Sequence, residues 1–257
     1  MHHDLIEPWT GPPATLWVNL WVLPVVWGAL LLWFVVQSVR RREAVPGLLI
    51  LIGFSSLFWQ DAYINWGMYL LYNPDQPLMP WGSTTFTAPR KVWWTIFAYG
   101  IFWLAAVPAV LALAERLERR VPRVGRTAAT VLVGLPLFYL WDLLFEGAAV
   151  NGGFYSYISH WGPALTMHGG TMPLLFPILF IAASGVVFVW LVGWRAPDGH
   201  ARFEDWFGLH RIRAGLPREA ARVAVWVLVL NVVHIALCIV PLILIRIALL
   251  QPSPLVP

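Results

Sequence analysis

Six runs of mostly apolar residues constrain the fold of this chain more than any other feature. They cover about residues 16–38, 47–72, 92–114, 128–149, 172–194 and 221–249. A helix of about 20 apolar residues crosses the hydrocarbon core of a bilayer. The chain is also only 12% charged, whereas soluble domains are about 25% charged. The sequence therefore predicts an all-α, polytopic membrane helix bundle with about six transmembrane helices, in a single domain over residues 1–257.

The basic residues predict how the bundle lies in the membrane. They gather in the first, third and fifth connections, as Arg40–Arg42, as five arginines within 116–126 and as six within 195–222. The second and fourth connections contain only Arg90 and Lys91. Because basic loops stay in the cytoplasm, we expect a multi-pass plasma-membrane protein with both termini outside. Arginines placed in loops do not indicate a nucleic-acid partner; the expected partner is the lipid bilayer.

Three carboxylates lie inside the apolar runs, namely Asp61, Asp142 and Glu146. A charged side chain at the centre of a bilayer costs roughly 2.5–3.5 kcal/mol on insertion scales, so such residues are functional candidates. With the orientation above, all three fall in the outer half of their runs. Asp61 is followed at helical spacing by Asn65, and then by Tyr69 and Tyr72, which predicts a polar face on the second run.

Asp142 and Glu146 are four residues apart and share one helix face. Two neighbouring carboxylates repel each other when both are ionised, so one of them is expected to be protonated. Apart from Arg222 at the very start of the sixth run, Arg246 is the only cation within a run, and it lies near the outer end of the sixth. A neutral carboxylic acid beside an ionised one suits general acid–base chemistry. We therefore expect Asp61, Asp142 and Glu146 to be catalytic.

Further polar and aromatic residues near the same depth are expected to bind substrate. These are Asn65, Tyr72, Trp59, Trp66, Trp141, Tyr155, His168, Asn231 and His234. The tryptophans adjoin the carboxylates in sequence, and aromatic faces stabilise positive charge. The fourth connection, with Tyr155 and His168, is placed to fold over the site. The alternative is that these groups only bond helices together, which is the simpler interpretation for Asn231.

No metal and no cofactor are expected. The chain lacks the H-x-x-x-H and E-x-x-H spacings of zinc sites and has no glycine-rich phosphate loop. Its one cysteine, Cys238, excludes an internal disulfide and a cysteine-rich metal site.

Several motifs resemble the AveC-like spirocyclase family. They are WQDAYINWGMYLLYNP, FYLWDLLFEGAAVNGGFYSY, GPALTMHGGTMPLLFPILF and LVLNVVHIAL, which occur in the family's order between about Trp59 and Ile245. The resemblance implies an integral membrane cyclase of polyketide secondary metabolism, with many actinobacterial relatives, that closes a spiroketal and can act as a dehydratase. Members often carry a charged or amide residue in the fifth span, where this chain has PLLFPILF, so we expect no catalytic residue there.

The functional hypothesis is acid–base spiroketal formation or dehydration of a hydrophobic, polyketide-type hydroxy-ketone. Glu146 or Asp142 is expected to be the acid and the other the base or electrostatic stabiliser. Asp61 is expected to handle a second proton, while His168 and Tyr72 position hydroxyls. A membrane terpene cyclase would use the same groups. A proton-coupled transporter or a membrane scaffold is the alternative of another class, although no inverted repeat is apparent. The sequence does not indicate an oligomeric state.

Overall fold

The computed structural model describes residues 2–3, 9, 11–13, 16–80, 82, 84–160, 162–168 and 170–257. Its α-helices are α1 (Leu23–Arg41), α2 (Pro46–Ser55), α3 (Asp61–Gly67), α4 (Thr95–Arg120), α5 (Gly125–Asn151), α6 (Ala183–Gly193), α7 (Phe203–Trp206), α8 (Leu216–His234) and α9 (Val240–Leu249). Turns of π- or 3₁₀-helix extend or join them at Val18–Val22, Ser56–Gln60, Pro122–Val124, Pro177–Ala182, Leu209–Arg211 and Ile235–Ile239. The predicted all-α class is confirmed.

Five of the continuous helical stretches are long and apolar enough to cross a membrane. They are Val18–Arg41, Pro46–Gly67, Thr95–Arg120, Pro122–Asn151 and Leu216–Leu249. The fifth predicted run contains a shorter apolar helix, Phe180–Gly193. The bundle therefore contains helices in all six predicted runs, and five of them meet the length of a membrane span by themselves.

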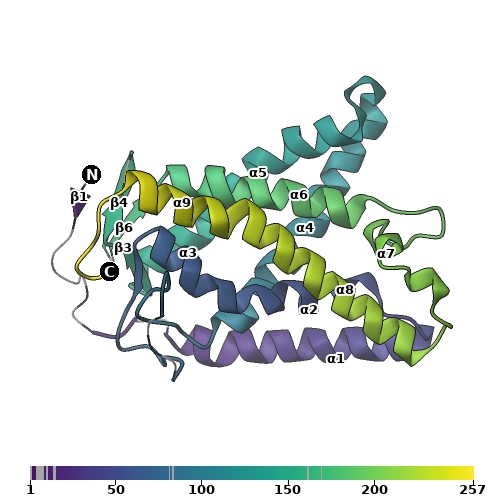
Figure 1. The fold of residues 1–257 in the computed structure, drawn as a ribbon, viewed down its shortest axis with the longest axis horizontal. Helices are drawn as coiled ribbons and strands as arrows, with labels where there is room; N and C mark the ends of the chain where they lie inside the picture. Colours follow the sequence, from purple (N-terminus) through teal and green to yellow (C-terminus); the bar gives the residue numbers. More distant parts are fainter. Residues whose placement is uncertain are drawn as a thin grey trace.

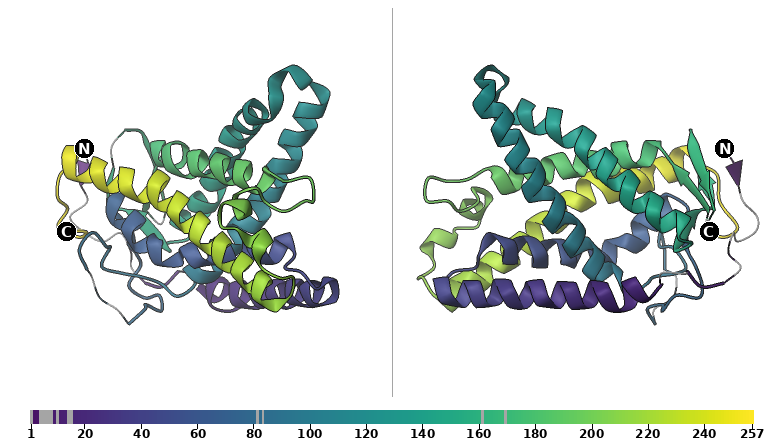
Figure 2. Two further views of the ribbon diagram at one scale, coloured as in Figure 1. Left: turned by 45° about the vertical axis from the view of Figure 1, so that its right-hand side comes forward. Right: turned by 180° about the vertical axis from the view of Figure 1, so that it is seen from behind.

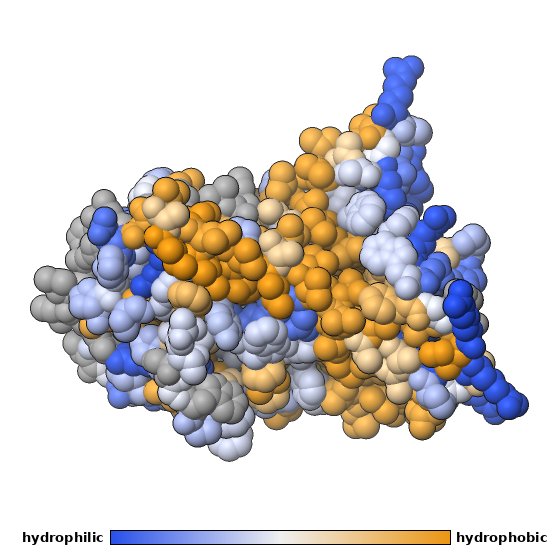
Figure 3. All heavy atoms as spheres, viewed as in Figure 1, coloured by the Kyte–Doolittle hydropathy of each residue, from blue (hydrophilic) through white to orange (hydrophobic). Residues whose placement is uncertain are grey.

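The two ends of the bundle differ in character. Strand β1 (His2–His3) and the C-terminal residues lie together at one end, whereas the turn from α1 to α2, the α4–α5 hairpin and α7 lie toward the other (Figure 1). On the face drawn in Figure 3, hydrophobic side chains form a broad zone across the middle of the bundle, and many of the most hydrophilic residues gather at the α7 end. An apolar band between two polar ends is the surface expected of a membrane-spanning bundle.

Short antiparallel strand pairs form a cap at the end that holds the termini. Strand β2 (Leu70–Tyr72) pairs with β3 (Tyr155–Tyr157), and β1 pairs with β4 (Ser159–His160). Strand β5 (Ala164–Met167) pairs with β6 (Gly170–Pro173). The fourth connection thus forms part of a folded cap, which joins the second run to the end of α5.

Two predicted spans extend too far. The run 47–72 is helical only to Gly67, after which Tyr69 takes a left-handed φ of 57° and the chain continues as β2. The run 172–194 begins within β6, and its helix follows. Leu70 and Leu71 are buried in the cap as strand residues. Their hydropathy extended the predicted helix, because hydropathy does not distinguish a buried strand from a helix. The expected helical face from Asp61 to Tyr72 is therefore wrong beyond Asn65.

A buried ionic network fastens the α7 end. Glu204 on α7 is 2% exposed and pairs with Arg222 of α8 at 2.9 Å, while Trp226 Nε1 donates a hydrogen bond to it at 2.8 Å. Arg222 also pairs with Glu219 at 2.8 Å, and Glu219 accepts a hydrogen bond from the backbone N–H of Ala44. The network ties α7, α8 and the residues before α2 together away from the capped end.

Candidate active site

A cavity of about 400 Å³ lies beneath the strand cap. Asp61 of α3 and both Asp142 and Glu146 of α5 line it. The remaining wall is largely apolar and aromatic and includes Ile64, Met68, Leu70, Trp94, Tyr99, Phe102, Trp103, Phe145, Phe154 and Phe176. Apolar cavities with a few convergent polar groups are typical of small-molecule sites. The three carboxyl groups singled out in the sequence therefore share one cavity, although they come from two helices.

Asp61 is held by three hydrogen bonds. Asn65 Nδ2 donates to its Oδ2 at 2.7 Å, and the Tyr72 hydroxyl donates to the same oxygen at 3.1 Å. The Tyr99 hydroxyl donates to Oδ1 at 3.2 Å. Both oxygens of Asp61 therefore act as acceptors, as those of an ionised carboxylate do. Asn65 lies four residues from Asp61 on α3, Tyr99 comes from α4, and Tyr72 returns to the site on β2.

The pair on α5 has different surroundings. Asp142 is 3% exposed, and its buried Oδ2 has no hydrogen-bond partner among the described residues. Glu146, one turn further along α5, accepts a hydrogen bond from the Tyr157 hydroxyl of β3. Buried polar groups are normally paired, so an unpartnered oxygen on a residue that lines the cavity marks Asp142 as a candidate contact for a ligand.

The tyrosines of the cap remain hydrogen-bond donors at neutral pH. Burial, and then the charge of Asp61, raises the pKa of Tyr72 well above its usual value. Burial and the charge of Glu146 do the same to the pKa of Tyr155 and to that of Tyr157. All three hydroxyls therefore stay neutral and can donate to a carboxylate or to a substrate oxygen. Tyr72 and Tyr155 also line the cavity.

Three expected substrate contacts lie outside the cavity and bond helices instead. The side-chain oxygen of Asn231 accepts from Gln60 Nε2 at 2.8 Å and from Trp59 Nε1 at 2.9 Å. The Gln60 side-chain oxygen is 2.8 Å from His234 Nδ1. This polar cluster connects α8 to the turn Ser56–Gln60, so the helix-bonding alternative describes Asn231, His234 and Trp59.

Three more of the expected substrate contacts, Trp66, Trp141 and His168, also lie outside the cavity. The Trp66 ring stacks on the guanidinium of Arg246 at 3.9 Å, so the intramembrane arginine is stabilised by an aromatic face and by backbone carbonyls. The Trp141 ring packs on Phe145 with centroids 4.7 Å apart. His168 is exposed in the turn between β5 and β6. Adjacent residues on a helix point in different directions, which is why nearness in sequence to a carboxylate does not place a side chain beside it.

Tyr99 and Tyr157 are two residues of the site that the sequence did not predict. Both donate to a catalytic candidate, at Asp61 and Glu146 respectively. A tyrosine within an apolar span was an available signal for Tyr99, since its hydroxyl needs a partner when it is buried. For Tyr157 the signal was weaker, because the alternating Tyr155-Ser156-Tyr157 pattern indicates a strand but not its partner.

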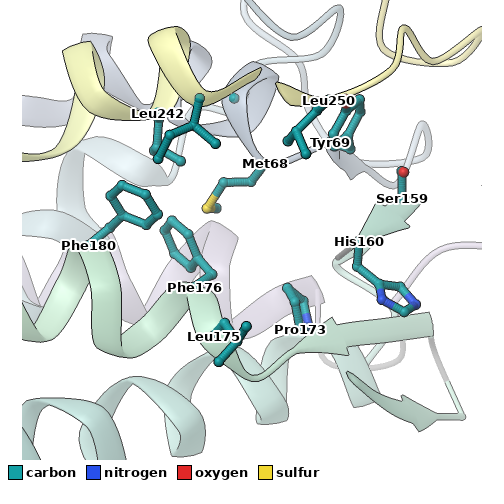
Figure 4. A pocket seen from close by; sticks show the side chains of 12 residues that line it. Met68, Tyr69, Ser159, His160, Pro173, Leu175, Phe176, Phe180, Leu242 and Leu250 are labelled. Carbon is teal, nitrogen blue, oxygen red and sulfur yellow. The ribbon is translucent and has the colours of Figure 1, made fainter. Parts of the chain in front are cut away.

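A second hollow under the cap is too small to hold an organic substrate. It measures about 30 Å³, and Figure 4 shows Met68, Phe176, Phe180 and Leu242 on its inner side and His160 toward the strands. Its volume corresponds to about one water molecule. The larger cavity is therefore the candidate site. No cluster of three or more His, Cys, Asp or Glu side chains able to hold a metal occurs in the described part of the chain.

The fold and the cavity together define a bundle of apolar, membrane-length helices with an acid-lined site beneath a strand cap. Residues 39–257 match the family model described as "Spirocyclase AveC-like". The chain belongs to this family, and the match confirms the resemblance noted between Trp59 and Ile245. No curated protein and no solved structure matches the chain. Membership supports an enzyme of the cyclase or dehydratase type. Helix α1 lies almost entirely outside the matched residues.

Proposed function

We propose that this protein is a membrane-embedded cyclase that closes a spiroketal, or dehydrates the product, from a polyketide-type hydroxy-ketone. The observation that supports it most is the placement of two unlike carboxyl sites in one apolar cavity. Asp61 accepts three hydrogen bonds, whereas Asp142 has a buried oxygen without a partner in the described structure. One site thus has the contacts of an anion, and the other is open to a substrate hydroxyl.

In the proposed mechanism Asp142 is the acid. Its proton passes to the hydroxyl of a hemiketal, the C–O bond breaks, and water leaves an oxocarbenium ion. A second hydroxyl of the substrate attacks the cation and gives its proton to Asp61. The reaction loses one water molecule in total, and the proton gained by Asp61 balances the one given by Asp142. Dehydration uses the same acid and takes a carbon-bound proton in place of the attacking hydroxyl's proton.

The cavity walls contribute to the same step. Aromatic side chains such as Trp94, Phe102 and Tyr155 line the space in which the cation forms, and their faces stabilise positive charge. Glu146, hydrogen-bonded to Tyr157, supplies a further carboxyl group beside Asp142. The largely apolar lining limits competing attack by water. With the arginine-rich connections in the cytoplasm, the capped cavity lies toward the outside of the cell.

The same aromatic wall supports one alternative, an isoprenoid cyclase in which a carboxylic acid protonates an alkene or an epoxide. Substrate alone separates the two reactions. A proton-coupled carrier and a scaffold remain further outcomes, because carboxylates inside a membrane also relay protons.

The test compares Asp61→Asn, Asp142→Asn and Glu146→Gln with the unaltered protein in membranes. A hydroxy-ketone spiroketal precursor and a polyprenyl epoxide are supplied in parallel. We expect spiroketal or its dehydrated product from the first substrate only, and loss of that product in Asp61→Asn and Asp142→Asn. The exposed loop variant Asp75→Asn is the control and keeps full activity. Unchanged activity in all three site variants would overturn the carboxylate mechanism.

A further inference from the structure

The candidate cavity reaches the surface of the bundle beside α5. Most of the side chains that line it are buried or half-buried, but Phe145 is 47% exposed and Ala148 is exposed as well. The two residues are three apart on α5 and so lie on the same face of that helix. These two residues therefore mark where the cavity wall reaches the surface of the bundle.

The opposite side of the opening belongs to the start of the first helix. Val18 and Asn19 of the π-helical turn and Leu23 of α1 line the same cavity. Helix α4 packs against both α1 and α5 and lies between them. From behind, the beginnings of α1 and α4 and the end of α5 converge at one end of the bundle (Figure 2). The opening lies over the beginning of α4, between the start of α1 and the end of α5.

The surface around the opening is apolar. Trp21 is 69% exposed on one side, and Leu144 is 70% exposed on the other. Both belong to helices of membrane-spanning length. In a bilayer this part of the surface contacts hydrocarbon, so the opening faces lipid rather than water. Inside, the buried carboxyl groups of Asp61 and Asp142 lie among apolar walls.

We propose that the opening between Val18–Leu23 and Phe145–Ala148 is a lateral entrance through which the substrate reaches the site from the bilayer. The substrate class is then an amphiphile that partitions into lipid. Its hydroxylated end passes inward to Asp61 and Asp142, and its apolar end stays toward Phe145 and the hydrocarbon. Asn19 is the amide side chain on the outer wall. The wall at Val18–Leu23 lies outside residues 39–257, which match the family model.

The identity of the substrate rests on the proposed function, but the entrance can be tested without turnover. Cys238, the only cysteine, is buried and is first replaced by Cys238→Ala. Thr95→Cys then places a thiol in the cavity wall at a position that is 2% exposed. The protein in phosphatidylcholine vesicles is treated with N-dodecylmaleimide, which resides in the bilayer, or with a membrane-impermeant cationic methanethiosulfonate supplied on both sides. Leu140→Cys, at an exposed position of the membrane-length helix α5, is the reference for a thiol accessible from lipid.

We expect the dodecylmaleimide to label Thr95→Cys and the impermeant reagent to leave it largely unlabelled. Ala148→Trp narrows the opening and is expected to slow dodecylmaleimide labelling about tenfold or more. Val18→Trp should do the same from the opposite wall, which guards against misfolding of one variant. The matched control Leu144→Trp, on the same helix but not in the wall, should have no effect.

Rapid labelling by the impermeant reagent, unaffected by either wall variant, would overturn the lateral entrance. So would failure of both reagents to reach Thr95→Cys while Leu140→Cys is labelled. A protein that is labelled from lipid but converts no hydroxy-ketone would retain the entrance and contradict the proposed function, so the two ideas fail separately.

Discussion

The Tyr72 hydroxyl donates a hydrogen bond to Asp61 Oδ2 at 3.1 Å, from strand β2 to helix α3. This bond joins the strand cap to the candidate active site. Strand β2 pairs with β3, whose Tyr157 donates in turn to Glu146 on α5. Asp61 and Glu146 thus each accept a hydrogen bond from one strand of the same pair, which links α3 to α5 through the cap.

Tyr72→Phe should reduce turnover while leaving the fold intact. The substitution removes one hydrogen bond to a carboxylate, which is worth about 1.5–3 kcal/mol. If that bond holds Asp61 in the geometry that receives the proton, kcat falls about ten- to hundredfold. The measurement is product formation in vesicles, normalised to folded protein. Tyr139→Phe on α5, which does not line the cavity, is the matched control, and equal rates for both variants would show that Tyr72 does not position Asp61.

Asn231→Ala should mainly lower stability, whereas Asn65→Ala should mainly lower activity. The Asn231 side chain accepts hydrogen bonds from Trp59 and from the fully buried Gln60, away from the cavity. Its loss removes the shorter bond of the Gln60 amide, so we expect a cost of about 1–3 kcal/mol of stability. Asn65 contacts Asp61 in the cavity, so its loss should lower activity more than stability. Thermal unfolding in detergent and turnover, measured on both variants, check the pattern. A larger activity loss in Asn231→Ala would return that residue to the site.

Glu204→Gln should destabilise the α7 end. Arg222 is then left with Glu219 as its carboxylate partner, and breaking a buried ion pair costs about 3–5 kcal/mol. We expect a lower melting temperature and earlier proteolysis between Arg195 and Arg213. The exposed acid Glu43, changed to glutamine, is the control for loss of one negative charge. An unchanged melting temperature would mean that the pair is not a stabilising element.

Gly185→Ala should lower stability through overpacking. A Cβ at this position of α6 would lie 2.6 Å from Cδ2 of Phe138, which is fully buried. Overpacking of this kind typically costs about 1–3 kcal/mol. Gly28→Ala on α1 is the matched control, since its Cβ would meet nothing within 4 Å, and helix propensity alone favours alanine there by about 1 kcal/mol. The melting temperatures of the two variants should shift in opposite directions, and a stabilised Gly185→Ala would contradict the close contact between α5 and α6.

The sequence by itself determined the helical class, the approximate location of the apolar helices, the family and the three carboxylates. These follow from local properties, since hydropathy identifies a span and an intramembrane acid is costly wherever it occurs. The i,i+4 relation of Asp142 to Glu146 and of Asp61 to Asn65 was also local, because it needs only the helix period.

Only the tertiary structure decided which side chains meet the carboxylates. Tyr99 and Tyr157 reach them from other elements, while Trp66, Asn231 and His234 face elsewhere. Helix periodicity defines the faces of a helix but not how the helix is rotated against its neighbours, which depends on packing of the whole bundle. The end of α3 at Gly67 also depended on distant residues. Leu70–Tyr72 form a strand because they pair with β3, more than 80 residues later in the chain.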